Sequence, residues 1–284
     1  MKLSFYILLG LVAIIFSSCS NFHFQVFESK PINKETYTDG EYFIFENDSI
    51  KLTYSFWGDK GLLSYSLENK LNKGIYVDWK SSSFIINGKK FDYWEDQIVS
   101  TSVTTGTSSS ITSGTSYRIP YSYKGLSFTS SEFESFSNTI SDKPEKITFI
   151  PPNSHIDKKN FLIYPYPYYD LTCNSTNTEI VSRSDNPRKK TKVYSANFEE
   201  KNSPLKFRNY LSISFSESSS PTLFVDNGFY VSKIFEVSKK HFLGRRHYQA
   251  YGNPTFDKPF KKKKNFYIEI EFKENNFDFR NNCN

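Results

Sequence analysis

Few residues in this chain of 284 have the types and spacing that catalysis or metal binding requires. Its four histidines include no pair one helical turn apart, and no two of its three cysteines lie at the spacing of a zinc site. Neither a G-x-S-x-G nucleophile elbow nor a glycine-rich phosphate loop occurs. Neighbouring carboxylates such as Glu95 and Asp96 would point to opposite faces of a strand, so they form no local acid–base pair. We therefore predict no catalytic residues, no metal and no cofactor, with a site assembled from distant residues as the alternative.

The first cysteine follows a segment that is typical of an export signal. Lys2 gives a positive start, residues 3–16 are almost entirely apolar, and two serines precede Cys19. This order of charge, apolar core and small residues is that of a secretory signal peptide. The apolar run of about 14 residues is shorter than the ~20 residues that cross a bilayer as a helix. We therefore predict cleavage rather than a membrane-spanning anchor.

The stretch Ile15-Phe16-Ser17-Ser18-Cys19 resembles the lipobox of bacterial lipoproteins. The resemblance implies that residues 1–18 are removed and that Cys19 carries the lipid and becomes the mature N-terminus. Two or three acyl chains on that residue would anchor the protein stably to a membrane. The alternative is an ordinary secreted protein. Residues 19–39 hold few periodic apolar positions, and we interpret them as a tether.

The other two cysteines are Cys173 and Cys283. In an oxidising envelope compartment they either form a disulfide or remain as two free thiols, and the sequence favours neither.

Basic residues form three clusters in a chain whose formal net charge is +6. The clusters are residues 188–190, residues 239–240 with 245–246, and residues 261–264. One interpretation is attraction to anionic polymers such as lipopolysaccharide cores or acidic glycans. The other is solvated loops that keep the chain soluble. We do not expect nucleic acid as a partner in a cell-envelope compartment.

Residues 161–169 hold five aromatic residues and two prolines. The tyrosines of this segment are Tyr164, Tyr166, Tyr168 and Tyr169. Rigidly presented rings would suit stacking on sugars or on a protein partner. Alternatively, these rings cover the hydrophobic core.

The elements that must position these residues are predicted to be strands. Apolar and polar residues alternate strictly over residues 49–56, and further along the chain over 63–68, 75–80, 211–216 and 266–273. Asn87-Gly88 and Asn227-Gly228 predict two-residue hairpin turns. One or two helical turns are expected near residues 234–241. The pattern indicates an all-β, antiparallel β-sandwich (immunoglobulin-like) with long loops and little helix. A mean hydropathy of −0.55 excludes a membrane protein with several spans.

This β-sandwich is expected to occupy residues 40–273, with residues 274–284 as a tail. Thirteen of the 17 residues at 100–116 are Ser or Thr, which predicts a loop, with O-glycosylation as a sharper interpretation. Either one elaborated domain or two sub-domains divided near residues 153–160 fit the pattern.

The lipobox-like start, the Phe-, Tyr-, Asn- and Lys-rich composition and the alternating strands resemble uncharacterised lipoproteins of Bacteroidota-type bacteria. Residues 84–88 and 146–152 are similar to the strand and strand-end patterns of that group. The resemblance implies a place at the outer membrane and no particular activity. Asp48-Ser49-Ile50 also resembles the short O-glycosylation site of such bacteria, which would place a glycan on Ser49; alternatively, Asp48 only closes a turn.

These observations predict a lipid-anchored cell-envelope protein that binds or scaffolds without enzymatic activity. Its expected partners are the membrane, through Cys19, and envelope proteins or glycans. The alternative is a glycan-binding lipoprotein or a carbohydrate-active hydrolase whose site is dispersed along the chain.

Overall fold

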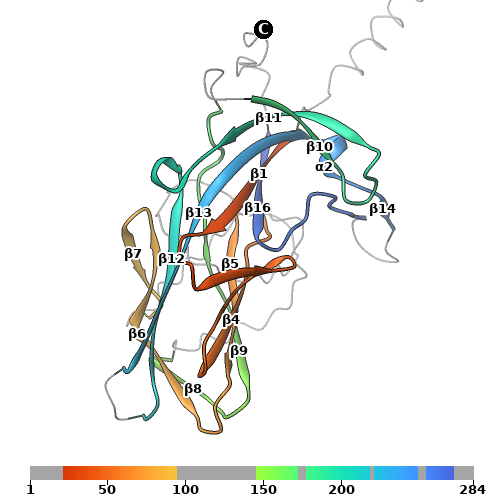
Figure 1. Ribbon diagram of the computed structural model, residues 1–284. Helices are drawn as coiled ribbons and strands as arrows, with labels where there is room; N and C mark the ends of the chain where they lie inside the picture. The colour runs from red at the N-terminus through yellow and green to blue at the C-terminus, as the bar shows by residue number, and fades with distance from the viewer. Residues whose placement is uncertain (1–21, 95–144, 172–176, 218–220, 249–253, 272–284) are drawn as a thin grey trace, which may run out of the picture.

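The computed structural model describes residues 22–94, 145–171, 177–217, 221–248 and 254–271. Nearly all of the regular secondary structure in this part is β-strand, arranged as antiparallel sheets in a sandwich-like manner (Figure 1). Among the described residues helix is confined to α2 (Lys239–Phe242) and the short 3₁₀ helix η2 (Glu200–Asn202). The predicted all-β sandwich with little helix is therefore confirmed. The helical turn near residue 240 is also present, but residues 234–238 belong to a strand.

The smaller sheet has five strands in the order β2-β3-β4-β5-β9. Alternation along the predicted strand at residues 49–56 is reproduced in β4, where Ile50, Leu52 and Tyr54 are buried and the residues between them are not. The bounds are β2 (Thr36–Asp39), β3 (Tyr42–Glu46), β4 (Ile50–Ser55), β5 (Leu62–Asn69) and β9 (His155–Leu162).

The larger sheet has nine strands built around two long ones, β13 and β6. Strand β13 pairs with β12 and then β11 along one edge and with β1 along the other, and β16 continues the sheet beyond β1. Strand β6 pairs with β12 on one side and with both β7 and β8 on the other. The bounds are β1 (Phe22–Pro31), β6 (Ile75–Ile86), β7 (Lys89–Asp92), β8 (Ile147–Ile150), β10 (Asn177–Ser182), β11 (Lys190–Asn197), β12 (Lys206–Ser214), β13 (Leu223–Ser238) and β16 (Asn265–Glu271). A separate two-stranded ribbon joins β14 (Arg246–His247) to β15 (Thr255–Phe256).

The predicted tether is wrong for most of its residues, and of the two open alternatives for the domain the division into sub-domains does not fit the structure. Residues 22–31, expected to belong to a tether, form β1 between β13 and β16, and residues 36–39 form the edge strand β2. The suggested division near residues 153–160 falls on β9, which pairs with β5 from the first half of the chain. One hydrophobic core then draws residues from both halves, so the described strands form a single domain.

Of the two predicted hairpin turns, only Asn87-Gly88 is confirmed. Its residues have φ angles of 46° and 81° and join β6 to β7. Asn227-Gly228 instead lies inside β13, opposite Asn209 and Arg208 of β12. A long, continuous β13 has replaced the expected hairpin.

Buried polar contacts explain why Asn227 remains in a strand. The amides of Asn209 and Asn227 both donate to the hydroxyl oxygen of Tyr54, at 3.0 and 2.9 Å, and the Tyr93 hydroxyl donates to the Asn209 side chain at 2.6 Å. These side chains lie between the two sheets and are buried. Burial raises the pKa of Tyr54, so its hydroxyl stays protonated. The network links β4 to β12 and β13 across the sandwich.

The apolar side chains form two clusters on opposite faces of the larger sheet. The main cluster fills the space between the sheets, and β1 contributes Phe27 to it. The second lies on the outer face, where Phe24 and Val26 of the same strand meet Phe242 of α2 and Phe260. Strand β1 is therefore covered on both faces.

Candidate anion-binding surface

The outer apolar cluster fixes two of the basic segments onto the larger sheet. The ring of Phe242 is fully buried and stacks on Phe24 with a centroid distance of 3.9 Å. Phe260 is also buried and packs against Phe235 of β13. Lys240 is two residues before Phe242 and Lys261 directly follows Phe260, so burial of the two rings holds both exposed lysines over the same face.

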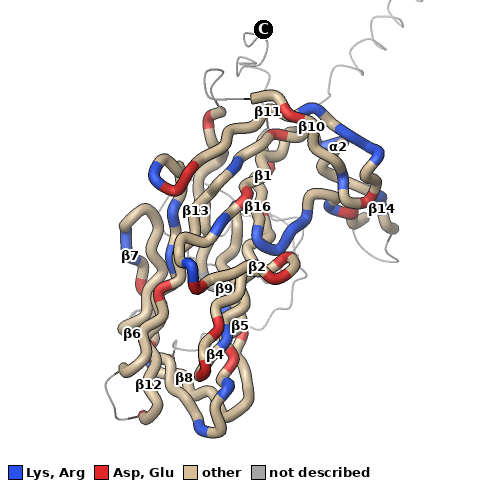
Figure 2. Tube along the Cα trace, in the orientation of Figure 1, with Lys and Arg blue, Asp and Glu red and all other residues tan. Residues whose placement is uncertain are grey.

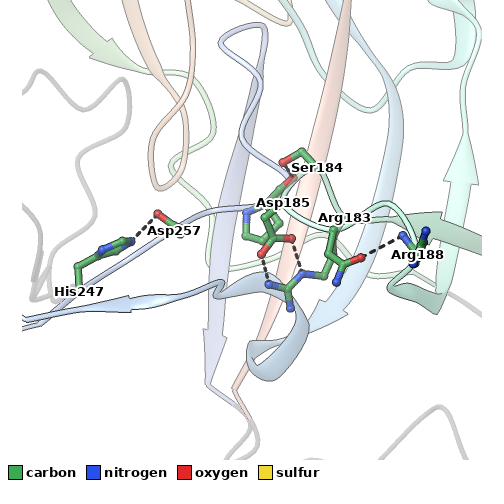
Figure 3. Close-up of polar contacts among 8 residues, drawn as sticks. Arg183, Ser184, Asp185, Arg188, His247 and Asp257 are labelled. Carbon is green, nitrogen blue, oxygen red and sulfur yellow. Dashed lines mark hydrogen bonds and ion pairs between the residues drawn. The ribbon is translucent and has the colours of Figure 1, made fainter.

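Backbone contacts bring the third basic segment to the same place. The Ser184 hydroxyl and the Ser184 amide both donate to the carbonyl oxygen of Pro259, at 2.5 and 3.2 Å. The amide of Gly244 donates to the carbonyl oxygen of Asp257 at 2.7 Å. The amide of Asp257 in turn donates to the carbonyl oxygen of Arg245 at 2.9 Å. The connection between β10 and β11, the α2–β14 segment and residues 255–264 therefore form one surface, whose polar contacts Figure 3 shows.

The carboxylates of this surface are already paired. Asp185 accepts two hydrogen bonds from Arg183, at 2.8 and 2.5 Å, and these bonds lower the pKa of Asp185. Asp257 contacts the His247 ring at 2.8 Å, and Glu269 lies 3.9 Å from Lys239. These acidic groups thus contact Arg183, His247 and Lys239, and in the described part of the chain they form no ion pair with the other basic residues of the surface.

These other basic residues form the candidate site, which we call the basic surface. Within the described ranges no ion pair involves these side chains: Arg188, Lys189, Lys190, Lys240, Arg245, Arg246, Lys261, Lys262, Lys263 and Lys264. Figure 2 shows the blue segments around α2 and β14 and along the path toward β16. A surface with so many like charges attracts anions, and the attraction weakens as salt screens it.

The surroundings of His241 lower its pKa, first through burial and then through nearby cations. Its Nδ1 lies 2.8 Å from the Ser238 hydroxyl. Burial lowers the pKa of His241, and the nearby charges of Lys240, Arg183 and Lys189 lower it further. Cations from the β10–β11 connection and from α2 therefore act on the same imidazole, as expected if the two segments form one surface.

The tyrosine segment contributes mainly to packing. Tyr164 is buried and its ring meets Phe27 and Tyr166 in the core, while Tyr166 and Tyr169 pack against the core edge. The amide of Tyr169 donates to the Gln25 side chain at 2.7 Å. Only Tyr168 is largely exposed, at 51%. The four tyrosines therefore do not form a continuous aromatic surface.

The other predicted site residues lie apart from the basic surface or outside the described residues. Ser49 is half-buried in the turn between β3 and β4, where its amide donates to the Asn47 side chain at 2.9 Å. Cys19, Cys173 and Cys283 lie outside the described residues, as does the loop at 100–116. Among the residues that the structure places, no group of three or more His, Cys, Asp or Glu side chains could hold a metal ion.

The molecule is thus an all-β, sandwich-like domain that carries a basic outer surface. Comparison with protein-family models, curated proteins and solved structures found no match. No helix in the described ranges is both long and apolar enough to span a bilayer.

Proposed function

We propose that this chain is a lipid-anchored protein of the cell envelope that binds anionic polymers without catalysing a reaction. The observation that carries the binding function is the basic surface, because two neighbouring basic segments meet there with a third from earlier in the chain and their acidic neighbours are paired. Acidic glycans and lipopolysaccharide cores have the complementary charge and belong to the proposed compartment. A scaffolding role toward an acidic envelope protein would use the same charges.

The position of β1 supports an anchor close to this surface. The strand begins at Phe22, three residues after Cys19, so the chain between them spans at most about 10 Å. At this end of β1, His23 lies opposite Ser238, which directly precedes α2. A lipid on Cys19 would therefore hold the basic surface near the headgroups, where phosphorylated envelope polymers begin.

The anchor is tested by labelling cells with a palmitate analogue. The wild-type protein is expected to incorporate the label and to be processed in a globomycin-sensitive way, whereas Cys19→Ala should lose essentially all label. Cys173→Ala is the matched control, since it removes a cysteine that the proposal does not acylate. Undiminished labelling of Cys19→Ala would contradict the proposal of a lipid anchor on Cys19. The proposed binding function would then depend on the heparin experiment alone.

The binding function is tested on immobilised heparin, a highly anionic glycan. We expect the protein to be retained at low salt and released as salt screens the attraction. The triple variant Lys240→Gln, Arg245→Gln, Arg246→Gln should bind about tenfold more weakly, because each exposed charge contact contributes a fraction of a kcal/mol to about 1 kcal/mol.

A matched triple variant distinguishes binding by the basic surface from general attraction to the positive net charge of the protein. Lys73→Gln, Lys80→Gln and Lys146→Gln remove the same charge from exposed positions on or beside β6 and β8, and retention should stay near that of the wild type. Equal loss in both variants, or no retention of the wild type at low salt, would refute a specific basic surface.

A carbohydrate-binding role through aromatic stacking is the alternative. Its support in the structure is the exposed ring of Tyr168, since the neighbouring tyrosines are buried or half-buried against the core. A single exposed ring is a smaller platform than the basic surface.

A further inference from the structure

A pocket of about 390 Å³ opens where the basic surface reaches the gap between the two sheets. The larger sheet contributes residues 28–31 of β1 and Ser232 of β13, and the smaller sheet contributes Thr38 and Phe43. The basic segment at 261–264 and the first residue of β16 complete it with Lys262, Lys264 and Asn265. The volume falls at the lower end of the range for small-molecule sites, about 300–1,000 Å³.

The pocket exists because β16 stops before β1 does. Strand β16 begins at Asn265, opposite Glu28, so Ser29 is the first residue of β1 without a partner on that side. At the same point the register between β1 and β13 shifts, because Glu28 lies opposite Lys233 and Ser29 opposite Val231. β-Bulges of this kind redirect side chains and are common beside functional sites.

Ser29 has an unmet hydrogen bond in this pocket. Its side chain is only 5% exposed, and its hydroxyl has no partner among the residues that the structure describes. A buried hydroxyl without a partner costs about 1–3 kcal/mol, so few such groups persist in folded proteins. A ligand atom that bonded to this hydroxyl would relieve that cost.

The charges of the lining select the kind of ligand. Three lysines, Lys30, Lys262 and Lys264, contribute positive charge, and Glu28 contributes one negative charge. The cations suit one carboxylate or phosphate, while the Glu28 carboxylate is an acceptor for hydroxyl donors. Pro31 supplies apolar surface of the kind that packs against the carbon face of a sugar ring, while the ring of Phe43, buried in the core, forms the floor of the pocket.

We infer that this pocket binds one sugar residue carrying a single anionic group, either a carboxylate or a phosphate. This inference rests on the proposed function. The basic surface would bind an anionic polymer, and the pocket would bind one sugar unit of that polymer. The Ser29 hydroxyl and the lysines hold the anionic group, and Glu28 accepts from the ring hydroxyls.

The test is calorimetric titration of the mature protein in detergent with glucuronate, glucose 6-phosphate and glucose. Binding of glucuronate or glucose 6-phosphate, with glucose much weaker, is expected, and the stronger of the two identifies the anionic group. Ser29→Ala should weaken that binding about tenfold or more, because a hydrogen bond to a charged group is lost. The variant Lys262→Gln, Lys264→Gln should weaken it at least as much.

Thermal unfolding of the unliganded Ser29→Ala variant shows whether a loss of sugar binding comes from a loss of folding. Its midpoint should equal or exceed that of the wild type, since alanine removes an unsatisfied buried hydroxyl. The control Lys73→Gln, Lys80→Gln removes the same charge from exposed positions outside the pocket and the basic surface and should leave sugar binding unchanged.

Failure of this inference differs from failure of the proposed function. If heparin retains the protein but neither charged sugar binds at millimolar concentration, the pocket assignment is overturned and the basic surface stands. The assignment is also overturned if a charged sugar binds to Ser29→Ala and to the double lysine variant as tightly as to the wild type. If a charged sugar binds with the expected variant effects while heparin does not retain the protein, the pocket stands and the proposed polymer binding falls.

Discussion

Replacing Phe229 with alanine is expected to lower the free energy of unfolding by about 3–5 kcal/mol. Phe229 is fully buried at the centre of the sandwich. Its ring lies 5.0–5.4 Å, centroid to centroid, from four others that come from both sheets and the segment after β4: Phe43, Tyr54, Phe56 and Phe207. The truncation removes apolar contacts and leaves a cavity that rigid neighbouring strands would fill only partly.

The matched control is Phe224→Ala on the same strand. Phe224 is 57% exposed and stacks only on Tyr210, so its truncation should cost less than about 1 kcal/mol. Urea denaturation followed by circular dichroism would measure both. Similar losses in the two variants would show that the core does not centre on Phe229.

Gly61→Ala is expected to destabilise the protein by about 2–5 kcal/mol. Gly61 has a φ of +69°, a conformation that costs an L-residue about 1–2 kcal/mol. An added Cβ would also lie 2.8 Å from Cγ of Phe266 and 3.1 Å from Cβ of Ile163, both fully buried. Overpacking of this kind typically costs a further 1–3 kcal/mol.

Gly88→Ala separates the two contributions. Gly88 has a comparable φ of +81°, but nothing lies within 4 Å of the position that its Cβ would take. Its substitution should therefore cost only the conformational part, about 1–2 kcal/mol. If chemical denaturation gives equal losses for Gly61→Ala and Gly88→Ala, the predicted steric clash with Phe266 does not occur.

The sequence predicted strands where one face is buried and the other is wet. Residues 49–56 alternate because β4 has one face in the core, and β4 occupies nearly those bounds. In β16, charged residues such as the exposed Glu269 preserve the alternation, although Tyr267 on the same face packs into the outer cluster. Strand β1 escaped detection because both of its faces are covered, and its inward positions include the polar Gln25. Asn227-Gly228 was mistaken for a turn because hydrogen bonds with Tyr54, distant in sequence, override the local preference.

The candidate site was predictable in its parts but not in its assembly. The three basic clusters are evident in the sequence, and the aromatic residue beside two of them, Phe242 and Phe260, was a further signal of docking against the domain. Their meeting depends on contacts such as that between Ser184 and Pro259, which no local pattern encodes. Ser29 carried no signal, because only the end of β16 turns an ordinary strand serine into part of a pocket wall.

The place of β1 between β13 and β16 has a consequence for the order of synthesis and folding. The first strand of the domain pairs with residues more than 190 positions away on both sides, from His23 opposite Ser238 to Phe22 opposite Glu271. Pairings this remote make folding slow, since the long intervening chain must be closed before they form. The larger sheet cannot be completed until the ribosome has made nearly the whole chain. If the chain is exported as proposed, this late pairing would keep the larger sheet open during passage through a channel that accepts only unfolded polypeptide.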